Sequence, residues 1–79
     1  MGRTNQEMDW GIRASRFLKA ELRRAGVGYK ELAERLNKQG LEETETSITG
    51  KLARSTFAAS FLLATMEAIG LEQVRLHDF

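Results

Sequence analysis

The sequence predicts an all-α protein, and three features of its composition and spacing support this fold class. Proline, which kinks or ends helices, is absent from all 79 residues. Valine and isoleucine, which favour strands, total only five residues. Apolar residues recur every three or four positions through most of the chain, which is the spacing of a helix buried on one side. We expect four to five short helices and no sheet.

The length of the chain limits it to a single domain. Its 79 residues fall below the roughly 100 to 200 residues of a typical domain, so there is no room for a second core. The composition, 42% hydrophobic and 29% charged, is typical of a folded globular protein. We therefore expect one domain over residues 1–79, with a flexible N-terminus at residues 1–8 and a frayed tail at residues 77–79.

The composition also indicates a cytoplasmic protein. Cysteine is absent, which excludes disulfides and zinc-thiolate sites and is compatible with a reducing compartment. The longest stretch without a charge, residues 55–66, is too short for a membrane helix of about 20 residues. The first ten residues lack the apolar segment of a secretory signal. We expect neither secretion nor a membrane partner.

Two helices are predicted in the first half of the chain. The first covers about residues 9–25, with Asp9 as its N-cap and Gly26 as its C-cap. The second follows Gly28 and ends at Gly40. The positions expected to face the core are Trp10, Ala14, Phe17, Leu18, Leu22 and Ala25 in the first helix, and Tyr29, Leu32, Ala33 and Leu36 in the second.

Two further helices are predicted in the second half. The third covers about residues 45–54, and the fourth runs from a cap at residue 55 or 56 to about residue 69. Residues 71–79 are expected to form one helical turn and a loosely held end. The residues that cap, bury or end these helices are Thr44, Ile48, Leu52, Ser55 or Thr56, and Gly70.

The second and third predicted helices resemble a known DNA-binding motif. Residues 29–36 read Tyr-Lys-Glu-Leu-Ala-Glu-Arg-Leu and are followed by Gly40-Leu41, by Ser47-Ile48 and by Leu52. This pattern resembles the helix-turn-helix of the lambda-repressor-like (Cro-type) superfamily, and the resemblance covers about residues 10–76. It implies a sequence-specific DNA-binding protein, a bacterial transcriptional regulator, with the third helix in the major groove.

A second resemblance brings no activity with it. The run Arg-Ala-Ser-Arg-x-Leu-Lys-x-Glu-Leu at residues 13–22 and the run Glu-Thr-Glu-x-Ser-Ile at residues 43–48 are similar to those of a small bacterial domain family of unknown function.

The connection between the second and third helices departs from the helix-turn-helix pattern. Leu36 and Ile48 are twelve positions apart, about five more than in the standard motif, so we expect an extended turn. This segment brings Glu42, Glu43 and Glu45 to the start of the third helix, where they oppose binding to phosphates. A helical protein–protein interaction module that lacks groove binding is therefore the alternative function.

The DNA contacts implied by the resemblance fall into two groups. On a helical wheel with Ile48 and Leu52 inward, the outward face of the third helix is small and polar. The predicted base contacts are Thr46, Ser47 and Gly50. The predicted phosphate contacts are Lys30, Lys51, Arg54, Tyr29 and Thr56. An ordinary solvated helix face is the alternative interpretation.

Basic residues concentrate in the first half of the chain. Residues 1–38 hold nine basic and five acidic side chains, and residues 39–79 hold three basic and six acidic ones, for a net charge of +1. One arc of the first helix carries Arg13, Arg16, Lys19, Arg23 and Arg24. Such a stripe fits a nucleic-acid backbone or, equally, the solvated side of an amphipathic helix.

Two positions carry predictions about packing. Glu21 falls inside the apolar arc of the first helix, so we expect it to be buried and paired with Lys51 or Arg54, or else Arg35. The fourth helix is apolar around most of its circumference, which predicts a homodimer through Phe57, Phe61, Leu62 and Met66. Coverage of that helix by the tail at residues 71–79 is the alternative.

No enzyme is expected. The only histidine, His77, lies near the end of the chain beside Asp78, and Gly26-Val27-Gly28 is too short for a nucleotide-binding loop. The three glutamates at residues 42–45 lack the ligand pattern of a calcium loop. We predict no catalytic residue, metal, cofactor or small-molecule ligand.

Overall fold

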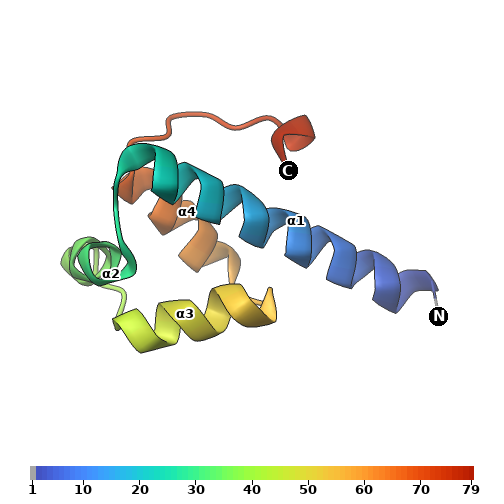
Figure 1. The fold of residues 1–79 in the computed structure, drawn as a ribbon, viewed down its shortest axis with the longest axis horizontal. Helices are drawn as coiled ribbons and strands as arrows, with labels where there is room; N and C mark the ends of the chain where they lie inside the picture. The colour runs from blue at the N-terminus through green and yellow to red at the C-terminus, as the bar shows by residue number, and fades with distance from the viewer. Residues whose placement is uncertain (1) are drawn as a thin grey trace.

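The computed structural model describes the backbone of residues 2–79 and the side chains of residues 9–79, and it is all-α (Figure 1). The elements are α1 (Gly2–Ala25), α2 (Tyr29–Lys38), α3 (Glu45–Arg54), α4 (Ala59–Ala68) and the 3-10 turn η1 (Leu76–Asp78). The α-helices cover more than half of the chain, and no strand occurs within residues 2–79. The predicted fold class is confirmed. No helix among these residues has the length and apolar character needed to cross a membrane.

The long helix α1 organises the arrangement. In Figure 1, α1 runs along the length of the molecule, α3 lies on one side of it, and the C-terminal tail passes along the other side. The helix α2 is seen end-on while α3 runs across the view, so these two helices cross at a steep angle. Both α1 and α2 contact α3 and α4. The molecule therefore presents α3 and the tail on different sides.

One hydrophobic core joins the four α-helices. Each short helix buries only two or three side chains and would be marginally stable alone. Most of its stability therefore comes from packing on the neighbouring helices. The buried apolar residues are Leu18, Leu22, Val27, Leu32, Ala33, Leu36, Ile48, Leu52 and Phe61. All but Val27 and Phe61 are among the positions predicted to face the core of the first three helices.

Several predicted helix ends are confirmed. Gly26, Gly40 and Gly70 have φ angles of 72°, 94° and 81°, the left-handed conformation that ends helices. Thr44 caps α3 by accepting a hydrogen bond from the backbone N–H of Ser47, and the Ser47 hydroxyl accepts one from the Thr44 backbone N–H in return. This capping box fixes the first turn of α3.

Two predicted helix starts are wrong. Helix α1 begins at Gly2, not near Asp9, because no proline or second glycine interrupts the chain before that point. Asp9 instead forms an ion pair with Arg13 at 3.6 Å. Helix α4 begins at Ala59 with Ala58 as its N-cap, so neither Ser55 nor Thr56 caps it.

Ser55 has a different role from the predicted one. It ends α3 in the left-handed conformation, with φ 59°. The chain then needs the residues up to Ala58 to turn into α4, which shortens that helix at its start.

The C-terminal tail also differs from the prediction. Residues 77–79 were expected to fray, but Leu76–Asp78 form η1 and the Phe79 ring packs on Phe17 with centroids 4.6 Å apart. The Arg13 Nε donates a hydrogen bond to the Phe79 carbonyl oxygen at 3.0 Å. An aromatic contact and a hydrogen bond to a charged group together hold this end on α1. Met1 and the side chains of residues 1–8 lie outside the described residues, so the flexible N-terminus stays a prediction.

Small residues of α1 allow the end of α3 to approach closely. The Ser15 hydroxyl, which is buried, donates a hydrogen bond to the Leu52 carbonyl oxygen at 2.6 Å. One turn earlier, a Cβ atom added to Gly11 would clash with the backbone carbonyl oxygen of Ser55. A helix leaves its last carbonyls without partners, and here α1 supplies one. Gly11 and Ser15 have no large apolar side chain, so hydrophobic periodicity does not predict this contact.

We expect Gly11→Ala to destabilise the fold and Gly50→Ala to stabilise it. A Cβ at Gly11 meets rigid backbone, so overpacking should cost roughly 1–3 kcal/mol. At Gly50 the nearest atom is Nη1 of Arg54 at 2.9 Å, at the end of a flexible side chain. The helix preference for Ala should then add about 0.5–1 kcal/mol. Urea denaturation of both variants tests this, and stabilisation by both changes would contradict the close approach.

Candidate nucleic-acid interface

Helix α3 is held with one face inward and the other exposed. Ile48 and Leu52 are fully buried in the core. Glu45, Thr46, Thr49 and Ala53 are exposed. The Thr49 hydroxyl donates a hydrogen bond to the Glu45 carbonyl oxygen at 2.9 Å, so it lies along the helix and adds little bulk. The outward face is small and polar, as the helical wheel predicts, but it is centred on Thr46 and Thr49.

Two of the three predicted base contacts are already engaged within the protein. The Ser47 hydroxyl donates to Oε1 of Glu43 at 2.6 Å and accepts from the Thr44 backbone N–H at 2.9 Å. The guanidinium of Arg54 lies over Gly50, close enough to touch a Cβ placed there. Of the predicted set, only Thr46 is exposed and without such an engagement. The wheel gives directions but not neighbours, so it did not show these contacts of Ser47 and Gly50.

The predicted phosphate contacts are also divided. Lys30, Arg54 and Thr56 are exposed, and Tyr29 is half-buried against the core. Lys51 forms a close ion pair with Glu43, and its Nζ lies 5.0 Å from the centroid of the Phe61 ring. Its charge is therefore neutralised inside the protein, and it is not available to a phosphate in this arrangement.

The acidic segment before α3 is likewise split. Glu43 is only 7% exposed, whereas Glu42 and Glu45 are exposed. The backbone N–H of Glu43 donates to Oδ1 of Asn37 at 3.0 Å, which attaches the extended turn to α2. Glu43 therefore stabilises the fold, and Glu42 and Glu45 remain exposed to a partner near the N-terminus of α3.

Exposed cations gather near the start of α2. Lys19 and Arg23 of α1 line a hollow together with Gly28 and Tyr29. Lys30 follows on α2, and all three cations are exposed. Gly28 is the N-cap of α2 and has no side chain to bond the free backbone N–H groups of the first turn. This end of α2 therefore combines the helix dipole with three positive side chains.

The remaining residues of the α1 basic stripe are arranged differently. Arg16 and Arg24 are exposed. Arg13 is half-buried, with its guanidinium carbon 4.0 Å from the centroid of the Trp10 ring and its Nε bonded to the Phe79 carbonyl. Arg13 therefore holds the tail and is not part of a free basic surface.

Glu21 is buried as predicted, but its predicted partners are wrong. It is 9% exposed, and its carboxylate pairs with Arg24 of the same helix at 3.2 Å. Lys51 pairs with Glu43, and Arg35 pairs with Glu31 and donates to the Ala68 carbonyl. Glu21 faces the C-terminal tail and not the other helices, because α1 buries a second face beneath residues 71–79.

The residues proposed for a dimer interface belong to the core or pack on it. Phe61 is 2% exposed, and its ring lies 5.3 Å from that of Phe57. Leu62 and Met66 are partly buried against the same core. Phe61 is therefore buried within one copy, whereas Phe57, Leu62 and Met66 keep part of their surface exposed, and the homodimer stays a prediction. Helix α4 is apolar around most of its circumference because one side packs on α2 and another on α1, and Leu63 is left 60% exposed.

We expect Lys51→Met to destabilise the fold more than Lys30→Met. Without Lys51, the buried Glu43 carboxylate loses its ionic partner, which should cost more than about 1 kcal/mol. Lys30 is exposed, so its replacement should change the free energy of unfolding by less than about 0.5 kcal/mol. Both variants lose one positive charge. Equal midpoints in chemical denaturation would mean that the Glu43–Lys51 pair does not contribute.

Comparison with known proteins identifies a family but no function. The family described as a domain of unknown function, DUF6471, matches residues 10–74. The match extends from Trp10 in α1 to Val74 in the tail, and so includes all of α2, α3 and α4. Comparisons with curated proteins and with solved structures find no match. The prediction of a family of unknown function is confirmed, and this chain belongs to the DUF6471 family.

Proposed function

We propose that the chain binds duplex DNA in a sequence-specific manner, with α3 in the major groove, and acts as a transcriptional regulator. The observation that carries this proposal is the exposed face of α3, where Thr46, Thr49 and Ala53 form a small polar surface. Small side chains let a helix approach base edges, and hydroxyl groups bond to donors or acceptors there. The buried Ile48 and Leu52 and the capping box hold that face in one orientation.

The distribution of cations supports the same mode of binding. The N-terminus of α2, with Lys19, Arg23 and Lys30 around it, is suited to a backbone phosphate. Arg54, at the end of α3, can reach a second phosphate or a guanine edge. In this proposal the base contacts are Thr46 and Thr49, and the phosphate contacts are Lys30 and Arg54. The steep crossing of α2 and α3 is compatible with a lambda-repressor-like helix-turn-helix (Figure 1).

A protein–protein interaction module is the second candidate function. Glu42 and Glu45 are exposed at the start of α3, where a DNA-binding helix would meet phosphates. The neutralisation of Lys51 by Glu43 removes a cation from the same region. Both features weaken attraction to DNA and suit a partner that presents basic side chains.

Selection from a pool of random duplexes at low salt separates the two candidates. DNA binding predicts an enriched sequence and an affinity that falls with salt concentration. If no duplex is enriched, the DNA proposal fails, and the α3 face should then be tested against protein partners.

We expect Thr49→Glu to abolish duplex binding and Gln73→Glu to leave it unchanged. Both changes add one negative charge at an exposed position. Only Thr49 lies on α3, and the tail that carries Gln73 runs along the opposite side of α1 (Figure 1). A fluorescence anisotropy titration with the selected duplex measures the difference. Equal loss in both variants would indicate a general charge effect and not groove binding.

Lys30→Gln should reduce the salt dependence of binding by about one unit of the logarithmic slope, since one phosphate contact is lost. Arg75→Gln, an equal loss of charge in the tail, should leave the slope as it is. Titrations at several salt concentrations give both slopes. Identical slopes for the two variants would exclude Lys30 as a contact.

A further inference from the structure

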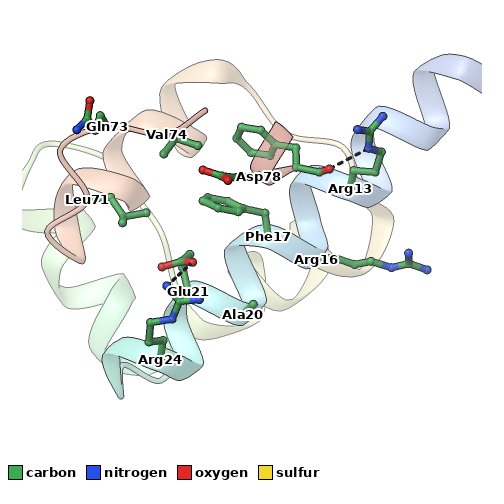
Figure 2. A pocket seen from close by; sticks show the side chains of 11 residues that line it. Arg13, Arg16, Phe17, Ala20, Glu21, Arg24, Leu71, Gln73, Val74 and Asp78 are labelled. Atoms are coloured by element: carbon green, nitrogen blue, oxygen red, sulfur yellow. Dashed lines mark hydrogen bonds and ion pairs between the residues drawn. The ribbon is translucent and has the colours of Figure 1, made fainter. Parts of the chain in front are cut away.

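A hollow lies between α1 and the C-terminal tail, and none of the proposed DNA contacts lines it. Its volume is about 530 Å³, within the range of pockets that hold small organic molecules. Figure 2 shows it from close by: one helix face carries Phe17, Ala20, Glu21 and Arg24, and the tail crosses above with Leu71, Val74 and Asp78. The tail that lines it passes α1 on the side away from α3 (Figure 1).

Polar and apolar side chains line the hollow in similar measure, and the apolar part is held in place. The Phe17 ring lies between the tail and α1, and the Phe79 ring packs on it. Leu71 and Val74 face them from the extended part of the tail. The hydrogen bond from Arg13 to the Phe79 carbonyl anchors the far end of the tail, which keeps the hollow formed while the tail is docked.

Two carboxylates line this hollow, those of Glu21 and Asp78. Glu21 is 9% exposed, and among residues 9–79 its one ionic partner is Arg24. Nη1 of Arg24 lies 3.2 Å from Oε2 of Glu21, and the Arg24 side chain is 75% exposed. Asp78 accepts the backbone N–H of Arg75 with Oδ2 and lies over Phe17. A carboxylate can accept about four hydrogen bonds, so both groups have unused capacity.

The cations around the hollow do not fill it. Arg13 is occupied by the Phe79 carbonyl, Asp9 and the Trp10 ring. Arg16 also lines the hollow, but its guanidinium extends away from Glu21 and Asp78 (Figure 2). Arg24 lies at the rim and can move into solvent, because three quarters of its side chain is already exposed. The carboxylates of the hollow that keep acceptor capacity are therefore the buried Glu21 and the exposed Asp78, beside the apolar side chains of Phe17, Leu71 and Val74.

We propose that this hollow binds a small organic cation, an ammonium or guanidinium group attached to an aromatic or aliphatic body. The cationic group bonds Glu21 and displaces the Arg24 side chain, with Asp78 as a second acceptor. The apolar body lies against Phe17, Leu71 and Val74. Aromatic faces and carboxylates together favour organic cations, since the ring face is electron-rich. The proposal is independent of DNA binding.

The test uses three probes of similar shape on the full chain: 2-phenylethylamine, which is a cation at neutral pH, the neutral 2-phenylethanol, and the anion 3-phenylpropionate. Amide chemical shifts are followed during each titration at millimolar concentration. We expect the amine to bind at least tenfold more tightly than the other two, with shifts at Phe17, Glu21 and Val74 and none in α3. Equal binding of the alcohol, or preference for the anion, would overturn the proposal.

Two variants with opposite expected effects identify the site. Glu21→Gln should weaken the amine at least tenfold, and Glu34→Gln, at an exposed position of α2, should leave it unchanged. Arg24→Gln removes the internal competitor and should tighten the amine several-fold. Arg24→Gln removes the ionic partner of Glu21, but the Arg24 side chain is 75% exposed and packs little, so the amide spectrum of this variant should keep the dispersion of the native fold. Weaker amine binding by Arg24→Gln would show that the arginine binds the ligand, which contradicts a cation site.

Discussion

The structure depends on hydrogen bonds from side chains to the carbonyl groups at the ends of its short helices. Helices α2, α3 and α4 have ten residues each, so a large share of their carbonyls have no partner within the helix. Side chains from neighbouring helices supply them: Ser15 of α1 bonds to Leu52 of α3, and Arg35 of α2 bonds to Ala68 of α4. These bonds act together with the core, because each can form only when the helices are packed in this order. The position of α3, and therefore of its exposed face, follows from them.

Apolar periodicity was sufficient to predict the helices and most of the core, but not the polar contacts between helices. Leu18, Leu32 and Ile48 were predicted because burial of large apolar side chains dominates their position. Ser15 donates a hydrogen bond to α3, and Gly11 leaves room for the backbone of Ser55 because it has no side chain. A hydrophobic pattern indicates neither property. The start of α4 was misplaced for a related reason, since Ser55 is a common N-cap residue but here ends α3.

Three residues of the candidate site have neighbours that a helical wheel does not show. A helical wheel gives the directions of Lys51, Ser47 and Gly50 around α3 but not which long side chains, from the extended turn or from α3 itself, reach them. Glu43 reaches Lys51 and Ser47 from the extended turn, and Arg54 reaches Gly50 from one turn further along α3. Pairing within the protein therefore engages the polar groups of Lys51 and Ser47. Thr49 is exposed, and its hydroxyl oxygen can still accept a hydrogen bond from a partner.

The docking of Phe79 on α1 has a consequence for folding. Its carbonyl bonds to Arg13 across a separation of 66 residues, whereas contacts such as that of α2 with α3 close short loops. The entropy lost on closing a loop increases with its length, and the tail has few contacts to offset it. The tail therefore docks after the helices have assembled and is released before they unfold, so native-state hydrogen exchange should be faster at Val74 than in α3.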